Sequence, residues 1–165
     1  NPPFSLSRQF WKLVIESKKN FLIISNLTCC VNTFYIPYFI KKAVWAGHNQ
    51  VFEFINEKGL TQRAAAGWFT NFAIKSRNNY KNFKFTPIEG IPSKYKKIDD
   101  NKILLVDNGF IPNDYENPFA VSQAPIFNGI LEKGYQIVQN KRYTPYINGK
   151  EKFARVLIQK KNTND

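Results

Sequence analysis

Two short, wholly apolar runs constrain the fold of this chain most strongly. They are Phe-Leu-Ile-Ile at residues 21–24 and Ile-Leu-Leu-Val at residues 103–106, and polar residues follow each of them. Four apolar residues without alternation are typical of a strand that is buried on both faces, as in a parallel sheet covered by helices. Strands that alternate with helices along a chain build such a sheet. We therefore expect an α/β fold.

The expected elements follow this alternation. In the first helix Phe10, Trp11 and Val14 fall on one face, while Arg8 and Lys12 remain exposed. We expect Pro37 to kink the second helix and Gly47 to end it. Helices are expected at residues 7–19, 27–46, 61–79, 119–123 and 150–159, and strands at residues 21–24, 51–55, 103–106, 126–127 and 135–138.

The charge balance predicts a polyanionic partner. The 165 residues contain 24 Lys and Arg against 12 Asp and Glu, for a formal charge of +12, and 43% of them are hydrophobic. Nucleic acid or an anionic membrane surface fits such a charge. The most apolar stretch, residues 27–40, has about 14 residues and is too short to span a bilayer. The first eight residues lack the apolar core of a secretory signal.

Cysteine and histidine usage limits the chemistry further. Cys29 and Cys30 are adjacent, so they cannot form a disulfide framework, and we expect both to be buried on a helix. His48 is the single histidine, which excludes most histidine-based metal sites and catalytic triads. It follows Gly47 at an expected helix end, where a structural role is favoured.

Basic residues alternate with aromatic ones in two parts of the chain. Residues 75–102 contain eight Lys and Arg, with Tyr80, Phe83, Phe85 and Tyr95 among them, and residues 133–161 contain eight more against one acid. Lysine and arginine neutralise phosphates, and aromatic rings stack on unpaired bases. A solvated basic surface is the alternative. Two such clusters in one chain favour contact with RNA or DNA.

A carboxylate follows the second apolar run. Asp107 stands at the carboxyl end of the expected strand, where open α/β folds bind ligands. Asp99, Asp100 and Asp114 are close in sequence. A metal-dependent nuclease needs carboxylates that are clustered with a defined geometry, and the sequence does not fix that geometry. Capping of a loop by aspartate is the structural alternative.

The segment at residues 63–72, Arg-Ala-Ala-Ala-Gly-Trp-Phe-Thr-Asn-Phe, resembles the signature of universal small-subunit ribosomal protein two, R-W-L-G-G-x-L-T-N-W. Arg63, Gly67, Thr70 and Asn71 match it at identical spacing, and Phe72 replaces an aromatic residue. Ile-Leu-Leu-Val-Asp at residues 103–107 looks like the apolar strand of that family that ends in Asp. The segments at residues 124–127 and 143–148 are similar to its I-P-V-F and Y-P-I-P-G-N-D stretches.

Several departures accompany this resemblance. Ala64, Ala65 and Ala66 replace the usual Trp-Leu-Gly, and the opening G-x-H-x-G-H segment of the family is absent. A short basic connection at residues 73–102 stands in place of the long helical hairpin of the bacterial members. A reduced organellar member of the family would look like this.

The resemblance implies a single domain over residues 1–165, with a three-layer α/β/α sandwich around a mostly parallel sheet in flavodoxin-like order. It implies a structural constituent of the small ribosomal subunit in the mitochondrial matrix, near the head–body junction. The implied partners are ribosomal RNA and neighbouring ribosomal proteins, with no catalysis, cofactor, metal, small-molecule substrate or membrane insertion. The residues that we expect to contact RNA are Arg63, Lys75, Arg77, Lys81, Lys84, Arg142, Lys150 and Arg155.

Two other functions remain open at this point. The first is a metal-dependent nucleic-acid-processing α/β enzyme that uses Asp107. The second is a docking subunit of an organellar membrane complex, with the aromatic segment at residues 27–46 as its docking face. Loss of activity in Asp107→Asn, with the fold intact, would distinguish the enzyme from the ribosomal protein.

Overall fold

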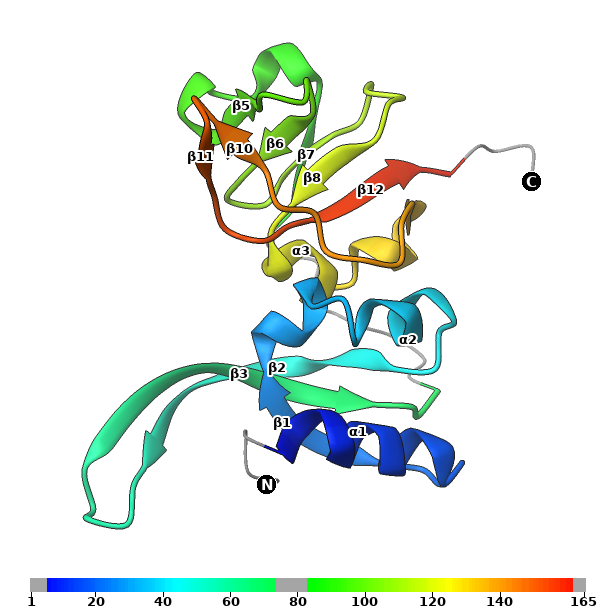
Figure 1. Ribbon diagram of the computed structural model, residues 1–165, viewed down its shortest axis with the longest axis vertical. Coiled ribbons are helices and arrows are strands. Elements are labelled where there is room, and N and C mark those ends of the chain that lie inside the picture. The colour runs from blue at the N-terminus through cyan, green and yellow to red at the C-terminus, as the bar shows by residue number, and fades with distance from the viewer. Residues whose placement is uncertain (1–5, 74–82, 162–165) are drawn as a thin grey trace.

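The computed structural model describes residues 6–73 and 83–161, without the side chains of residues 47–52, and shows two groups of elements that meet at a set of short helices (Figure 1). The N-terminal part contains α1 (Ser7–Glu16), β1 (Leu22–Asn26), η2 (Leu27–Val31), α2 (Ile36–Ile40), β2 (Trp45–Ile55) and β3 (Thr61–Thr70). Among the residues described, no helix is long and apolar enough to cross a membrane.

The three strands of this part form one sheet in the order β1-β3-β2. The central strand, β3, is antiparallel to both neighbours, so β1 and β2 run parallel to each other and end at the same edge. Asn26 of β1 and Val51 of β2 both pair with Ala66. Because β2 continues to Ile55, the β2–β3 hairpin extends beyond the end of β1.

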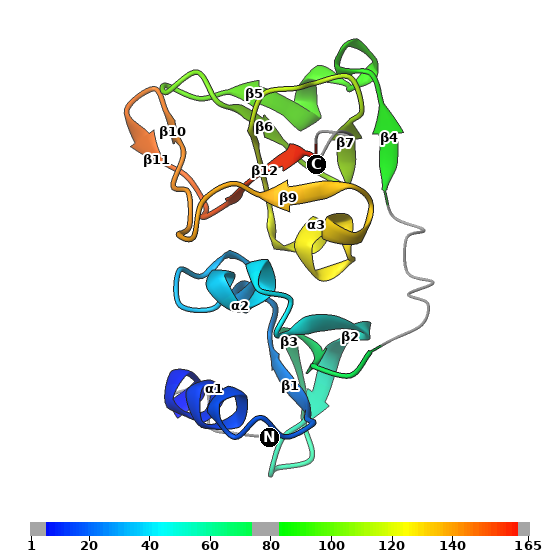
Figure 2. The ribbon, with the colours of Figure 1, turned by 90° about the vertical axis from the view of Figure 1, so that its right-hand side faces the viewer.

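The helix α1 lies beside this sheet (Figure 2), and one aromatic side chain attaches it there. Trp11 is fully buried, and its ring meets those of Phe69 on β3 and Tyr35 edge-on, at centroid distances of 5.4 and 5.1 Å. Such pairs contribute about 0.5–1.5 kcal/mol each beyond the burial of their area. The apolar face that predicts α1 in the sequence is therefore the face that packs.

The C-terminal part contains a five-stranded sheet in the order β5-β6-β8-β12-β9. Within it β6 and β8 are parallel, and the other neighbours are antiparallel. Its elements are β4 (Lys84–Thr86), η4 (Ile88–Gly90), η5 (Ser93–Tyr95), β5 (Lys96–Ile98), β6 (Leu104–Val106), β7 (Phe110–Pro112), β8 (Phe119–Val121), α3 (Gln123–Phe127), η6 (Ile130–Glu132), β9 (Tyr135–Ile137), β10 (Tyr146–Ile147), β11 (Lys150–Glu151) and β12 (Val156–Lys160).

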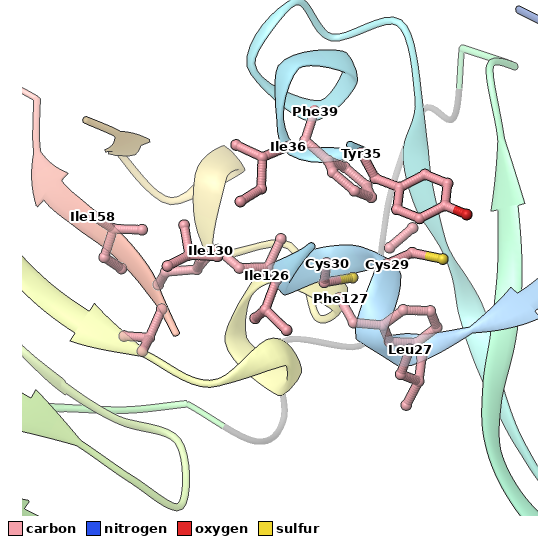
Figure 3. Close-up of a cluster of buried hydrophobic side chains, with 14 of the residues drawn as sticks. Leu27, Cys29, Cys30, Tyr35, Ile36, Phe39, Ile126, Phe127, Ile130 and Ile158 are labelled. Atoms are coloured by element: carbon pink, nitrogen blue, oxygen red, sulfur yellow. The ribbon is translucent and has the colours of Figure 1, made fainter. Parts of the chain in front are cut away.

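A shared hydrophobic core joins the two parts (Figure 3). Leu27, Cys30 and Ile36 from η2 and α2 face Ile126 and Phe127 from α3. Cys29 and Cys30 are 3% and 0% exposed, which confirms that both are buried, although they lie on a short 3-10 helix. The same cluster continues from Trp11 at one end to Ile158 at the other.

The expected three-layer α/β/α sandwich with flavodoxin-like order is wrong. The chain forms mostly short strands in mixed and antiparallel sheets. The expected helix at residues 61–79 is β3 as far as Thr70, because Trp68, Phe69 and Thr70 favour strands and pair with β1. The expected helix at residues 27–46 is divided into η2 and α2, and β2 already begins at Trp45.

Several elements in the C-terminal part also differ from expectation. The expected helix at residues 150–159 consists of β11 and β12, where buried Val156 and Ile158 alternate with more exposed neighbours at the period of a strand. Residues 119–123 begin with β8, and residues 126–127 belong to α3. The described part of the connection at residues 73–102 carries β4, η4, η5 and β5.

Candidate functional site

A polar pocket of about 590 Å³ opens where β1 ends. Its lining comes from the first turn of α1, the last residue of β1, the helix η2 and the residues after η2. The carboxyl end of a strand in an open sheet is a usual position for a ligand. We call this cavity the β1 pocket, and its lining consists of Ser7, Arg8, Gln9, Asn26, Thr28, Cys29, Asn32 and Tyr35.

Two asparagines of the β1 pocket are held in place through their carbonyl oxygens. Oδ1 of Asn26 accepts a hydrogen bond from the Thr28 backbone N–H at 2.9 Å and caps η2. Oδ1 of Asn32 accepts one from the Phe34 N–H at 3.0 Å. Each amide thus keeps its Nδ2 donors for a ligand, since an asparagine side chain carries one acceptor oxygen and two N–H donors.

A hydrogen-bonded network supports the pocket wall. Nε1 of Trp11 donates to Oγ of Ser25 at 3.3 Å, and Ser25 Oγ also bonds to Sγ of Cys29 at 3.3 Å. The hydroxyls of Ser7 and Tyr35 are 2.8 Å apart and share a hydrogen bond. These contacts fix α1 against η2, so the lining side chains are held before a ligand arrives.

Burial keeps the thiol and the phenol of the pocket protonated. Loss of solvent raises the pKa of the Cys29 thiol above its ordinary value, and it also raises the pKa of the Tyr35 hydroxyl. A thiol with a raised pKa is a poor nucleophile at neutral pH. Both groups therefore act as hydrogen-bonding parts of the wall, and the pocket is suited to recognition rather than to covalent attack.

The expected RNA-contacting residues that the structure describes lie on several different elements. Arg63 lies on the β2–β3 hairpin, with an 87% exposed side chain 3.6 Å from Glu53. Lys84 is on β4, where its Nζ lies 5.3 Å from the centre of the Phe110 ring, and Lys150 is exposed on β11. Lys75, Arg77 and Lys81 lie outside the described residues. Contact of these residues with nucleic acid stays a prediction.

Arg142 and Arg155 differ in their surroundings. The backbone N–H of Arg142 donates to Oγ1 of Thr33 at 3.1 Å, and Thr33 follows Asn32 of the pocket lining, so exposed Arg142 lies beside the β1 pocket. The Arg155 side chain is only 13% exposed, and its Nη2 lies 2.7 Å from Oδ1 of Asp107. Arg142 can therefore meet a phosphate, whereas Arg155 is engaged within the fold.

The residues of the matched decapeptide have structural roles in β3 and just after it. The Thr70 hydroxyl donates to the Phe21 carbonyl at 2.6 Å. Asn71 accepts from the Phe21 N–H at 2.9 Å and donates to the Lys19 carbonyl at 2.9 Å, which ties the end of β3 to the start of β1. Gly67 is packed against Phe127, and Phe72 is 44% exposed.

The aspartates around residue 100 accept hydrogen bonds from backbone N–H groups of nearby loops. Oδ1 of Asp99 accepts backbone N–H groups of Asn101 and Ile103, while Oδ2 accepts the Tyr143 hydroxyl. Asp100 accepts the N–H groups of Asn148 and Gly149 at 3.0 and 2.8 Å. Within residues 6–73 and 83–161, no group of three or more His, Cys, Asp and Glu side chains is placed to hold a metal ion.

The first four residues of the sequence carry a further signal. Asn1, Pro2, Pro3 and Phe4 place a carboxamide and an aromatic ring around two prolines, just ahead of α1. Asparagine hydrogen-bonds to adenine edges, and aromatic side chains stack on bases that have been extruded from a duplex. This tetrapeptide lies outside the described residues, but its composition could have pointed to base recognition next to Ser7 and Arg8.

Comparison with known proteins reveals one informative similarity. The chain is 26% identical over 205 residues to the type II methyltransferase M.MgeORF184P of Mycoplasma genitalium, and the match covers 97% of this chain. The chain spans 63% of the length of that relative. No model of a known protein family matches the chain, and no solved structure matches it significantly.

The ribosomal interpretation is wrong. The similarity over nearly the whole chain is to a type II methyltransferase, which contradicts both the assignment to ribosomal protein two and the expected lack of enzymatic activity. This finding also contradicts the expected ribosomal partners and the expected lack of a small-molecule substrate. The mitochondrial location stays a prediction, but the ribosomal resemblance that implied it is wrong. Of the functions left open by the sequence, a nucleic-acid-processing enzyme fits better.

Proposed function

We propose that the chain is part of an enzyme that transfers a methyl group to a base of a nucleic acid, and that the β1 pocket receives this base. The observation that carries the proposal is the polar pocket at the end of β1, in a chain that is similar to a type II methyltransferase. Enzymes that modify a base extrude it from the stack into a fitted pocket. The formal charge of +12 favours a nucleic-acid substrate.

The hydrogen-bonding groups of the β1 pocket suit a ligand with many acceptors. Asn26 and Asn32 keep their Nδ2 donors because their oxygens cap the backbone, and Arg8 adds a guanidinium. Ring nitrogens and carbonyl oxygens of a base accept such donors. A pocket of about 590 Å³ lies within the size range of ordinary small-molecule sites.

Basic groups at the rim can hold the backbone of the substrate. Arg8 lines the pocket from the first turn of α1, and the backbone of Arg142 is hydrogen-bonded to Thr33, the residue that follows Asn32 of the lining. Arginine contacts to phosphates position a nucleic acid without reading its sequence. The proposed roles are therefore separate, with base recognition inside the pocket and phosphate contact at its rim.

The β1 pocket does not fit a cationic methyl donor. Among the residues that the structure describes, its lining contains the Arg8 guanidinium and no carboxylate, so it would repel a sulfonium such as that of S-adenosylmethionine. We therefore assign the acceptor base, and not the methyl donor, to this pocket. What the described residues contribute is binding and orientation of the base.

Methyl transfer by the natural full-length protein tests the proposal. The protein is incubated with duplex DNA and S-adenosylmethionine that carries a tritiated methyl group, and label in the DNA is counted. Asn32→Asp keeps the oxygen that Phe34 N–H needs but replaces the Nδ2 donor, so we expect activity to fall about tenfold or more, as for one lost polar contact. Asn117→Asp, at an exposed position outside the pocket, adds the same charge as a control.

Two outcomes would overturn parts of this proposal. If the full-length protein transfers no methyl group to any nucleic acid, the proposed activity is wrong. If Asn32→Asp retains the activity of the Asn117→Asp control, the activity stands but the base is bound elsewhere. Variants Asn1→Ala and Phe4→Ala extend the test to the N-terminal tetrapeptide, where we expect loss of activity for both.

A further inference from the structure

The β2–β3 hairpin extends beyond the sheet as a two-stranded arm, which we define as residues 53–63 (Figure 1). In the arm Glu53 pairs with Arg63, Phe54 with Gln62 and Ile55 with Thr61. The third strand of the sheet, β1, reaches only as far as the partner of Ala66. Beyond that point, within the described part of the chain, β2 and β3 pair only with each other.

The arm projects from the edge at which the β1 pocket opens. Asn26, which lines the pocket, and Val51 lie at the same height along the sheet, because both pair with Ala66. From Val51 the strand continues four residues to Ile55, roughly 13 Å at 3.3 Å per residue. A ligand large enough to leave the pocket and follow this edge would therefore meet the arm.

The arm has an ordered tip, but its apolar side chains are exposed to solvent. Ile55 and Leu60 are 78% and 62% exposed, and isolated two-stranded hairpins are only marginally stable in water. Its tip is nevertheless ordered by Asn56, whose Oδ1 accepts the N–H groups of Lys58 and Leu60 at 3.0 and 2.9 Å. A tip with a fixed conformation loses little entropy when it binds a partner.

The side chains of the arm favour base edges over the phosphate backbone. Its four charged residues, Glu53, Glu57, Lys58 and Arg63, cancel, so the arm adds no net attraction to phosphates. Gln62 and Arg63 are base-reading residue types, and exposed apolar side chains contact thymine methyl groups. The Arg63–Glu53 pair is solvent-exposed and therefore weak, so Arg63 can exchange it for a base.

We propose that this arm enters the major groove of the duplex whose base occupies the β1 pocket. The major groove of B-DNA admits a two-stranded β-ribbon, and β-ribbons are known to read it. This inference rests on the proposed function, because it takes the nucleic acid in the pocket as given. It adds a partner surface and names the elements that would distinguish one sequence from another.

Site-specific cross-linking on the full chain tests the arm. Leu60→Cys at the tip and Leu13→Cys on α1 create thiols at positions of similar exposure, 62% and 68%, while native Cys29 and Cys30 are buried. Each variant is labelled with benzophenone maleimide and irradiated with a duplex DNA of mixed sequence. We expect the yield of protein–DNA cross-link from position 60 to exceed that from position 13 by about fivefold or more, because only the tip of the arm would contact the DNA.

The possible results separate the two proposals. If the chain binds the duplex, as measured by fluorescence anisotropy, but position 60 gives no excess cross-link, the arm proposal is wrong and the proposed function is unaffected. A cross-link from position 60 to a second copy of the chain in place of DNA also overturns the arm proposal. If the unlabelled chain binds no duplex at all, the nucleic-acid function fails and the arm proposal fails with it.

Discussion

Gly67 of β3 lies directly against the ring of Phe127 in α3, and a Cβ at position 67 would come within 2.4 Å of two atoms of that ring. Phe127 cannot retreat, because it is 2% exposed and meets Phe69 at a centroid distance of 5.7 Å. This contact joins the N-terminal sheet to the C-terminal part. The glycine that matches the ribosomal-protein signature is required by packing between the two parts.

Gly67→Ala is therefore expected to destabilise the protein. Overpacking of a well-filled core costs about 1–3 kcal/mol. The free energy of unfolding is measured by urea titration. Ala65→Val on the same strand is the control, since Ala65 is exposed and the change there is expected to stay within about 0.5 kcal/mol. Equal stability of Gly67→Ala and the wild type would mean that the two parts do not pack as described.

The ion pair of Arg155 and Asp107 is expected to matter more than that of Arg63 and Glu53. Asp107→Ala leaves a guanidinium that is 13% exposed without its carboxylate, and Arg155 Nε already has no acceptor within the described residues. Asp107 itself is 40% exposed, and solvent weakens its attraction to Arg155. We therefore expect the free energy of unfolding to fall by only about 1–2 kcal/mol. Glu53→Ala, in the exposed pair, is expected to cost less than about 0.5 kcal/mol.

Urea titration of both variants at low and high salt checks this order. The Asp107→Ala loss is expected to persist at high salt, because burial shields Arg155 from screening. A larger loss in Glu53→Ala would contradict the assignment of Arg155 to the fold. Asp107→Asn is also expected to retain methyl transfer, which separates this account from a metal-dependent enzyme that uses Asp107.

Tyr143 is expected to make stability depend on alkaline pH. Burial and the hydrogen bond to Asp99 raise the pKa of its hydroxyl from 10.0 to about 12. Because the folded pKa lies above the unfolded one, this stabilisation is complete below pH 10 and is lost as the pH rises toward about 12. Thermal melts from pH 9 to 12 should show a steeper loss in the wild type than in Tyr143→Phe. Parallel losses would contradict the role of this bond.

Salt dependence of binding distinguishes phosphate contacts from structural arginines. Arg142→Ala is expected to weaken duplex binding and to reduce the slope of log K against log salt by about 0.9. Arg155→Met is expected to change stability but not that slope, because Arg155 is engaged with Asp107. Fluorescence anisotropy at several salt concentrations measures both. A change of slope for Arg155→Met alone would reverse these two assignments.

Local patterns in the sequence predicted some elements because those elements depend on local signals. The helix α1, with its one-sided apolar face, begins at the expected residue and ends three residues early. The strand β6, with its apolar run, begins one residue late and ends at the expected residue. The segment at residues 61–70 was misread because an alanine-rich stretch favours helix by propensity. Its pairing with β1, about 40 residues earlier in the chain, determines that it is a strand.

The candidate site could not be predicted in the same way. Its lining comes from the start of α1, the end of β1, η2 and the residues after η2, and only the fold brings these segments together. The strongest charge signals instead marked scattered surface lysines and one buried ion pair. Near this site, the amide and aromatic residues of the first four positions carry a local signal for base recognition.

Fluorescence of 2-aminopurine, placed at successive positions of a bound duplex, tests the central claim most directly. A base that leaves the stack for the β1 pocket loses its stacking partners, so its fluorescence rises. We predict a rise at one position that is lost in Asn32→Asp and kept in Asn117→Asp, with both variants still bound by anisotropy. Binding without a fluorescence rise at any position, or a rise that survives in Asn32→Asp, would contradict the account.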